Sequence, residues 1–351
     1  MGSLNRREFL EVAEVGAATL FLNSKFSLIT QVERLQRSLL PTPEVHPIAS
    51  DSRLVGFAPS GNSSRIANEM MGQMDISPGT VNYFLTGTDG GAYDRLCFDI
   101  DWCMTNGIVP MVSWGPDTND IFGKNERDYL SLLAGMFDKK GPVLFRMYYE
   151  QNLINSFPWN SPDTSSKDFK RIWKDAYTLV KERSPKTNIV FSANTTGLWT
   201  YPIDDRFPGS EYVDMTGLDA YNKYSSNWLH PGHYIQPDLT PKELIGPDVY
   251  TLMKLAPGKP PPVITELNIQ RDDRSAWLKS SLEYSYSCGV RLVNFFQWDK
   301  SGKGSGETDW SFQQNTVTVL RKHFADTGWY IRKHARGTQG AGQVMHYLCA
   351  V

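Results

Sequence analysis

The chain has 351 residues, of which 40% are hydrophobic and 21% are charged, as in an ordinary globular protein. Its formal net charge of −2 excludes the broad basic surface that typically binds nucleic acid. Ten Trp and sixteen Tyr residues contribute to an aromatic content of 12%. Sugar-binding clefts use such rings as flat platforms, but we assign most of them to core packing.

The first residues carry a motif similar to the twin-arginine export signal. Asn5-Arg6-Arg7-Glu8-Phe9-Leu10 places paired arginines before Phe-Leu and a moderately apolar stretch from Val12 to Leu22. Glu11 and Glu14 interrupt this pattern, and no small-residue cleavage site follows. We therefore predict that residues 1–45 are either a signal or a helical arm. Export to the cell envelope or beyond is the first expectation, and a cytoplasmic location is the alternative.

From about residue 50, apolar strand-like runs alternate with helix-like stretches. The runs are short, continuously apolar and rich in Val, Ile and Phe, which is typical of parallel strands buried on both faces. Eight runs fit this description: Leu54–Ala58, Val81–Leu85, Ile108–Trp114, Val143–Met147, Ile189–Ala193, Val213–Asp219, Val263–Glu266 and Leu292–Trp298.

The stretches between these runs include clear helix signals. Helices are predicted over Tyr93–Thr105, Arg127–Phe137, Ser166–Ser184 and Arg274–Cys288. Eight β-then-α units predict a single-domain (β/α)₈ TIM barrel over residues 46–331. The long interval 222–262 is predicted to form a loop insertion over one face, and residues 332–351 are predicted to form a C-terminal tail. No segment is long and apolar enough for a membrane span.

Two glutamates close predicted strands. Glu150 follows the fourth strand and Glu266 closes the seventh. A carboxylate at the end of a buried strand is costly to desolvate, and the active site of a TIM barrel lies at the C-terminal ends of its strands. Strands four and seven lie on opposite sides of the barrel mouth, so the two side chains can face one another across a bound sugar. The pair therefore suggests a glycoside-cleaving dyad, with a carboxyl separation of about 5–5.5 Å for a retaining reaction.

Around these glutamates the sequence resembles glycoside hydrolase family 26, a β-mannanase-like family. The family's strand-four motif reads roughly Arg-Pro-Phe-His-Glu-Met-Asn-Gly and then Trp-Phe-Pro-Trp, where this chain has 146–152 (Arg-Met-Tyr-Tyr-Glu-Gln-Asn) and 157–159 (Phe-Pro-Trp). The strand-six motif Val-Asp-x-x-Gly-x-Asp-x-Tyr-Asn is matched by residues 213–222. Strands seven and eight match at 264–266 (Ile-Thr-Glu) and 296–299 (Phe-Gln-Trp-Asp).

The resemblance implies roles for particular residues. Glu150 would be the general acid/base and Glu266 the nucleophile, held ionised by a hydrogen bond from Tyr221. Trp298 would form the floor of the subsite for the reacting sugar. The remaining substrate-binding positions would be Arg146 and Asn152, which orient the glutamates and substrate hydroxyls, Tyr149, and the cleft-lining Trp114 and Trp159.

The chain also departs from the family pattern. The histidine that immediately precedes the acid/base is Tyr149 here, and tyrosine does not titrate near neutral pH. Leu153 replaces the glycine after the motif, and one residue is inserted before Phe157. The expected activity is endo-β-1,4-mannanase, with a β-1,3/1,4-glucanase (lichenase) or xylanase as alternatives. A further alternative is a catalytically weak or inactive carbohydrate-binding barrel.

Cofactor and metal motifs are not found in the sequence. Asp214, Asp219 and Asp299 lie at separate motif positions without metal-ligand spacing, so no metal and no cofactor is expected. The expected partner is a polysaccharide or oligosaccharide substrate, bound by a monomer that contacts no nucleic acid.

Overall fold

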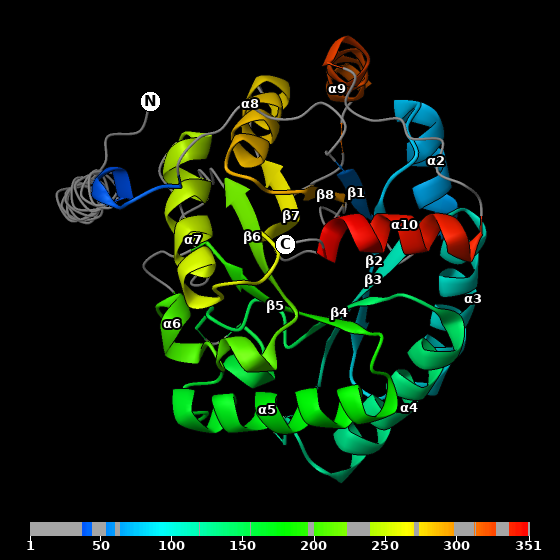
Figure 1. Ribbon diagram of the computed structural model, residues 1–351, viewed down its shortest axis with the longest axis vertical. Helices are drawn as coiled ribbons and strands as arrows, with labels where there is room; N and C mark the ends of the chain where they lie inside the picture. Colours follow the sequence, from blue (N-terminus) through cyan, green and yellow to red (C-terminus); the bar gives the residue numbers. More distant parts are fainter. Residues whose placement is uncertain are drawn as a thin grey trace, which may run out of the picture.

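The computed structural model describes residues 37–43, 54–59, 64–118, 120–154, 156–195, 200–222, 239–269, 274–297, 312, 314–327 and 337–349. Within these residues eight parallel strands form one closed barrel in chain order, which confirms the predicted TIM barrel (Figure 1). The strands are β1 (Leu54–Pro59), β2 (Thr80–Thr86), β3 (Val109–Gly115), β4 (Leu144–Met147), β5 (Asn188–Asn194), β6 (Met215–Asn222), β7 (Val263–Ile269) and β8 (Leu292–Gln297).

Helices between the strands form the outer layer of the barrel (Figure 1). The helices are α2 (Ser64–Met74), α3 (Gly90–Thr105), α4 (Lys124–Lys140), α5 (Ser166–Arg183), α6 (Ile203–Arg206), α7 (Pro241–Leu255), α8 (Arg274–Ser287), α9 (Gln314–Thr327) and α10 (Thr338–Cys349), with short 3₁₀ turns η2 (Pro158–Asn160) and η3 (Ser210–Tyr212). Of the helices described, none combines the length and apolar character needed to cross a lipid bilayer.

Helix α5 illustrates why these segments fold as they do. Ser165 caps its first turn, because the hydroxyl accepts a hydrogen bond from the backbone N–H of Asp168 at 3.1 Å. Its buried residues recur at helical spacing and form one apolar stripe against the barrel. The residues of this stripe are Phe169, Ile172, Trp173, Ala176 and Val180.

The prediction of a loop over the whole interval 222–262 is wrong, because α7 occupies its second half. Thr240 and Glu243 form a capping box: the Thr240 hydroxyl accepts from the Glu243 N–H at 3.3 Å, and the Glu243 carboxylate accepts from the Thr240 N–H at 2.8 Å. Pro241 at the first helical position strengthens the same signal. These start signals were present in the sequence but were outweighed by the many Pro and Gly residues around them.

The predicted C-terminal tail contains the helix α10, which packs against α3 and β3 (Figure 1). Three bonds tie this segment to residues that lie at the starts of strands or the end of α3. The Gly337 N–H donates to the Thr105 carbonyl at 3.2 Å, and Arg291 Nη1 donates to the Tyr347 carbonyl at 2.9 Å. Cys349 Sγ lies 3.5 Å from Asn188 Oδ1. Helix α10 therefore covers part of the N-terminal end of the barrel.

The end of the predicted N-terminal segment is attached to α7 by one buried arginine. Arg37 Nη2 lies 2.7 Å from both Asp248 Oδ2 and the Leu244 carbonyl, and its Nε donates to the Glu243 carbonyl at 2.9 Å. The twin-arginine-like motif at residues 5–10 lies outside the described residues, so export stays a prediction.

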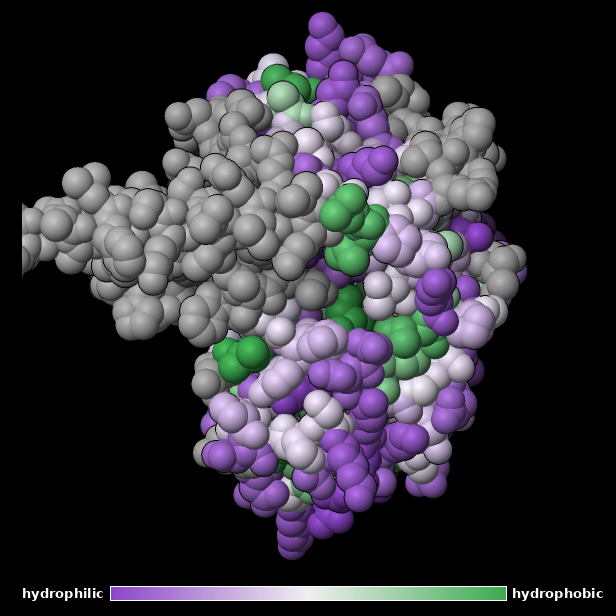
Figure 2. All heavy atoms as spheres, turned by 90° about the vertical axis from the view of Figure 1, so that its left-hand side faces the viewer, coloured by the Kyte–Doolittle hydropathy of each residue, from purple (hydrophilic) through white to green (hydrophobic). Residues whose placement is uncertain are grey.

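Among the described residues, large apolar side chains reach the surface at scattered positions. Figure 2 shows small green patches separated by hydrophilic residues on the face that it presents. The exposed large apolar residues lie on several different elements: Leu39, Leu40, Phe98, Leu132, Met253 and Val319. Such isolated residues are normal on the surface of a globular protein.

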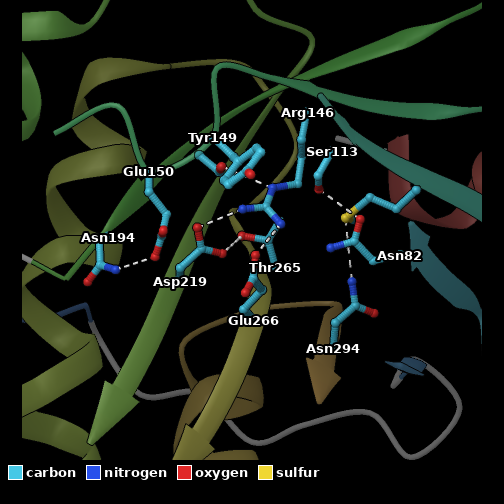
Figure 3. Close-up of polar contacts among 12 residues, drawn as sticks. Asn82, Ser113, Arg146, Tyr149, Glu150, Asn194, Asp219, Thr265, Glu266 and Asn294 are labelled. Atoms are coloured by element: carbon cyan, nitrogen blue, oxygen red, sulfur yellow. Dashed lines mark hydrogen bonds and ion pairs between the residues drawn. The ribbon is translucent and has the colours of Figure 1, made fainter. Parts of the chain in front are cut away.

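Hydrogen-bonded polar side chains fill part of the barrel interior (Figure 3). Thr80 Oγ1 donates to Asn294 Oδ1 at 2.5 Å, and Ser113 Oγ donates to Asn82 Oδ1 at 2.8 Å. All four side chains are buried, so each of these bonds offsets a desolvation cost. The Thr80–Asn294 bond spans β1, and it does so across Gly56, because any larger residue there would occupy the space between β2 and β8.

We expect Gly56→Ala to destabilise the protein by roughly 1–3 kcal/mol, the usual cost of overpacking a core. The added methyl group would collide with Asn294 Oδ1 and Thr80 Oγ1 and would lie 2.8 Å from the Thr80 carbonyl oxygen. Urea denaturation measures the change. The matched control is Gly72→Ala, an exposed position in α2 with no atom within 4 Å of the new methyl group, which should be neutral or stabilising. Equal stability of the two variants would contradict the packing argument.

Candidate active site

A fully buried arginine joins two carboxylates at the C-terminal half of the barrel. Arg146 on β4 donates from Nη1 to Glu266 Oε1 at 2.6 Å and from Nη2 to Asp219 Oδ2 at 2.7 Å (Figure 3). Its Nε donates to Ser192 Oγ at 3.0 Å. Arg146 and Asp219 are 0% exposed and Glu266 is 3% exposed. Charges so deeply buried persist only when they are paired and hydrogen-bonded, as these are.

The electrostatics of this network favour a permanent cation at Arg146. Burial lowers the pKa of the guanidinium, but Asp219 and Glu266 more than offset this effect, so its pKa is raised. Burial raises the pKa of the Asp219 carboxyl well above its usual value, and Arg146 acts in the opposite direction. Asp219 Oδ1 also accepts a hydrogen bond from Thr265 Oγ1 at 2.6 Å. Both carboxyl oxygens of Asp219 are therefore occupied as acceptors.

Glu266 lies within β7, which continues to Ile269, so the expectation that this residue closes the strand is wrong. Its position still faces the network because it is paired with Asp219 of β6, next to a register shift between Leu218 and Asp219. Tyr221 Oη donates to Glu266 Oε2, the oxygen that Arg146 does not contact. Burial and the charge of Glu266 raise the pKa of Tyr221 well above its usual value, so the phenol stays a donor.

Glu150 is half-buried in the turn that follows β4. Its φ of 51° and the φ of 50° at Tyr148 lie in the left-handed region, which costs free energy for residues other than glycine. Side chains of η2 hold the carbonyls of this turn: Trp159 Nε1 donates to the Tyr149 carbonyl at 2.9 Å, and Asn160 Nδ2 donates to the Glu150 carbonyl at 3.3 Å. The strained turn is thus fixed from outside.

Glu150 and Glu266 both raise the pKa of the same two tyrosine side chains. The charges of Glu150 and Glu266 each raise the pKa of Tyr149 and of Tyr221, in addition to the larger effect of burial. Figure 3 shows their side chains entering the same region from the β4 turn and from β7. The structure therefore brings the two predicted carboxyl groups to one site, although Glu150 and Glu266 are 116 positions apart in the sequence.

Tyr149 lies over the arginine. Its ring centroid is 5.5 Å from the Arg146 guanidinium carbon, a cation–π distance, and the side chain is 8% exposed. Its ring also makes edge contacts with Phe84 at 5.7 Å, Phe157 at 5.2 Å and Trp159 at 5.1 Å. Tyr149 is therefore part of the wall of the site and stays neutral.

An arc of aromatic rings continues from Tyr149 around the barrel mouth. Phe84 at the end of β2 contacts Phe296 of β8 at 6.1 Å, and Phe296 contacts Tyr221 at 5.5 Å, each edge to face. We call these residues the aromatic arc: Tyr149, Phe84, Phe296 and Tyr221. It connects the Glu150 side of the site with the Glu266 side, and Phe84 is its half-buried centre.

Three of the predicted substrate-binding residues have other roles. Trp114 is 0% exposed, donates from Nε1 to the Gly87 carbonyl at 2.9 Å and packs on Tyr129 of α4, so it does not line a cleft. Trp159 is 1% exposed beneath Phe157, whose ring is stacked on it at 4.5 Å. Asn152 is buried, and its side-chain amide bonds the backbone N–H and carbonyl of Asn194.

Side-chain alternation along β3 explains why Trp114 does not line the cleft. Ser113 points into the barrel, where it bonds Asn82, so the next residue on the strand points out toward the helices. The predicted Trp298 lies outside the described residues. Arg146, Tyr149 and Tyr221 do meet at the site together with Glu150 and Glu266 (Figure 3 labels all of these but Tyr221).

Several residues of the site were not predicted as members. Asp219 belongs to the strand-six motif, and Asn194 directly follows a predicted strand, so both carried a positional signal. Thr265 and Phe296 belong to the strand-seven and strand-eight motifs, whereas Phe84 had no signal beyond its place in an apolar strand. Within the described parts of the chain, no group of three or more His, Cys, Asp and Glu side chains could hold a metal ion. A surface hollow along α5, lined by Lys167, Lys170, Lys174 and Tyr212 among others, contains neither glutamate.

The arrangement gives the two glutamates different chemistry. Glu266 accepts a hydrogen bond from a cation at one carboxyl oxygen and from a phenol at the other. Glu150 accepts from a neutral amide, Asn194 Nδ2, at 2.5 Å and is more exposed. Two carboxyls in such unlike environments can serve as an ionised group and a proton donor side by side.

We expect Arg146→Met to destabilise the protein by roughly 3–5 kcal/mol at neutral pH, because two buried carboxylates lose their cation. Burial already raises the pKa of Asp219, and loss of Arg146 raises it further. The folded variant then binds a proton more tightly than the unfolded chain, so its deficit should shrink as the pH falls through that raised pKa. Denaturation at several pH values measures this. Arg171→Met, at an exposed arginine of α5, is the control, and a pH-independent deficit would contradict the argument.

The central part of the sequence matches a known family. Residues 130–236 fit the sequence model of Glycosyl hydrolase family 26. Two relatives named mannan endo-1,4-β-mannosidase, from Bacillus subtilis and from Bacillus subtilis strain 168, are each 33% identical to the aligned part. The alignments cover 30% and 32% of this chain, and 31% and 33% of the relatives. The chain thus aligns with about a third of the length of each relative.

Solved structures share the fold at low sequence identity. A β-mannanase of family 26 from Bacteroides ovatus has a TM-score of 0.59 and 14% identity, over 85% of this chain and 92% of that chain. The catalytic domain of a family 26 endo-β-1,4-mannanase from Bacillus sp. JAMB-750 has a TM-score of 0.59 and 16% identity, over 85% and 90%. The matched central region and the shared barrel together confirm the resemblance of this chain to glycoside hydrolase family 26.

Proposed function

We propose that this protein is a retaining glycoside hydrolase that cleaves a β-linked polysaccharide, and that its activity is endo-β-1,4-mannanase. The observation that carries the proposal is the contact set of Glu266, which pairs with Arg146 and Tyr221 while Glu150 faces the same site from the turn after β4 (Figure 3). The names of the Bacillus subtilis relatives support mannan as the polymer.

In this mechanism Glu150 protonates the leaving glycosidic oxygen while Glu266 attacks the anomeric carbon. Arg146 and Tyr221 orient the Glu266 carboxyl group, because each donates to a different oxygen. The glycosyl–Glu266 ester is then cleaved by a water molecule whose proton passes to Glu150. The sugar is released with retained configuration.

Two alternatives to this activity remain: a different polysaccharide substrate and a loss of catalysis. A β-1,3/1,4-glucanase or xylanase would use the same dyad, since Arg146 and Tyr221 bind the carboxyl group of Glu266. A catalytically weak or inactive carbohydrate-binding barrel is motivated by Tyr149, which replaces the family histidine. The intact Glu266 contacts argue against inactivity, because a buried carboxylate is costly to keep without a use.

The test is reducing-sugar release from mannan, glucomannan, lichenan and xylan. We expect the wild type to act on mannan, and Glu266→Ala to reduce the rate by roughly four orders of magnitude, as for loss of a covalent nucleophile. The anomeric form of the first product, followed by proton NMR, checks retention. Sugar binding without turnover of any polymer would favour the inactive barrel, and release from lichenan or xylan alone would replace mannan as the substrate.

The aromatic arc gives a second prediction. Phe84→Ala should lower kcat/KM on the polymer by roughly tenfold, since a ring contact contributes about 0.5–1.5 kcal/mol beyond its buried area. The matched control is Phe98→Ala, a phenylalanine of α3 that is 68% exposed and remote from the arc. Thermal denaturation of both variants separates a loss of folding from a loss of binding. Equal kinetics of the two folded variants would exclude Phe84 from the substrate site.

A further inference from the structure

Asn194, the last residue of β5, bonds the proposed acid/base directly. Its Nδ2 donates to Glu150 Oε1 at 2.5 Å (Figure 3). The amide is oriented by its own neighbour, because Thr195 Oγ1 donates to Asn194 Oδ1 at 3.3 Å. An amide whose oxygen accepts this bond has its NH₂ group turned toward Glu150.

The backbone of Asn194 is also fixed, and Asn152 fixes it. The Asn194 N–H donates to Asn152 Oδ1 at 2.7 Å, and Asn152 Nδ2 donates to the Asn194 carbonyl at 2.8 Å. A single buried amide thus pairs with both backbone groups of one residue. The backbone of Asn152 is held in turn, because its carbonyl accepts from the Tyr201 N–H at 2.7 Å.

These bonds connect the end of β5 to the turn after β4. Glu150 and Tyr148 have left-handed backbone conformations, so the turn would relax to other conformations without external contacts. The Asn152–Asn194 pairing supplies such a contact on the β5 side, and η2 supplies another through Trp159 and Asn160. The direction of the Glu150 carboxyl depends on both.

We propose that Asn194, held by Asn152, is a positioning residue that directs the catalytic proton of Glu150 to its Oε2 atom. The proposal rests on the proposed hydrolase function. An amide N–H only donates, so it bonds an oxygen that carries no hydrogen. Oε1 is bonded to Asn194, and the proton is therefore carried on Oε2.

The proton balance of both steps follows from this assignment. In the first step Oε2 gives its proton to the leaving oxygen as the glycosidic C–O bond breaks and the Glu266 oxygen bonds the anomeric carbon. In the second step a water oxygen bonds that carbon, the ester bond to Glu266 breaks, and Oε2 takes the proton of the water. Asn194 donates to Oε1 throughout.

The experiment compares leaving groups in Asn194→Ala and Asn194→Asp. On mannan we expect kcat/KM to fall by roughly 10–100-fold, the usual contribution of a positioned proton donor that is weakened and not removed. On a 2,4-dinitrophenyl β-mannoside or mannobioside the fall should be less than about threefold, because this leaving group departs without a proton. Glu150→Ala, measured in parallel, should show a larger difference between the fall in kcat/KM on mannan and the fall on the dinitrophenyl substrate.

The alkaline limb of the kcat/KM profile is the second measurement. Loss of a donor to the carboxylate disfavours its ionised form, and the negative charge of Asn194→Asp disfavours it further. Glu150 then keeps its proton to higher pH, so the alkaline limb should move upward in both variants, and more in Asn194→Asp. A purely structural role would leave the limb where it is.

The control is Asn188→Ala, an asparagine at the opposite end of the same strand, which should leave both measurements unchanged. Thermal denaturation establishes that each variant is folded. If Asn194→Ala does not fold, the nearly isosteric Asn194→Asp is used in its place. Equal losses on mannan and on the dinitrophenyl substrate, with an unmoved alkaline limb, would overturn the role of Asn194 alone. Wild-type protein that turns over neither substrate would overturn the proposed function, and the role with it.

Discussion

The site depends on one buried cation. Arg146 has no exposed surface, and its three donating nitrogens reach Glu266, Asp219 and Ser192 from three different strands. A guanidinium can do this because its donors are arranged in a rigid plane, whereas a lysine ammonium offers one point of charge. The same group therefore compensates two carboxylates electrostatically and fixes the positions of β5, β6 and β7 around the barrel mouth.

The rest of the interior accommodates this charge. Asp219 is itself held by Thr265, and a register shift beside Asp219 allows Glu266 to face the guanidinium. Tyr149 covers the cation with its ring, and the aromatic arc shields the network on the side of β2 and β8. A low-dielectric surround strengthens each of these contacts, and it also makes each partner costly to lose.

Sequence reasoning was reliable where a pattern is repeated and weak where it depends on a single side chain. Eight apolar runs with intervening helices predict the barrel because every unit repeats the same signal. Glu150, Glu266 and Tyr221 follow from their places in strand motifs. Trp114 does not, since a shift of one residue along β3 reverses the direction of a side chain, and the sequence contains no marker of that register.

Contacts between side chains on different strands were the other feature that sequence reasoning did not predict. Asn194 and Phe84 matter through residues on other strands, and only the closed sheet shows which strand ends are adjacent. Helix α7 is a different case, because its capping box was legible in residues 240–243 but lay among prolines and glycines that suggested a loop. Local signals of this kind were outweighed by composition.

Helix α10 has a consequence for how the protein is made. Its partners, Thr105, Asn188 and Arg291, are spread over most of the barrel sequence, and residues 337–349 leave the ribosome after all of them. The strands can pair during synthesis, but α10 cannot cover its part of this end of the barrel until residues 337–349 have been made. Contacts so distant in sequence also form slowly, because a long chain segment must be closed before they are made. The nascent barrel therefore has an interval in which the surface that α10 covers is not yet protected by this helix.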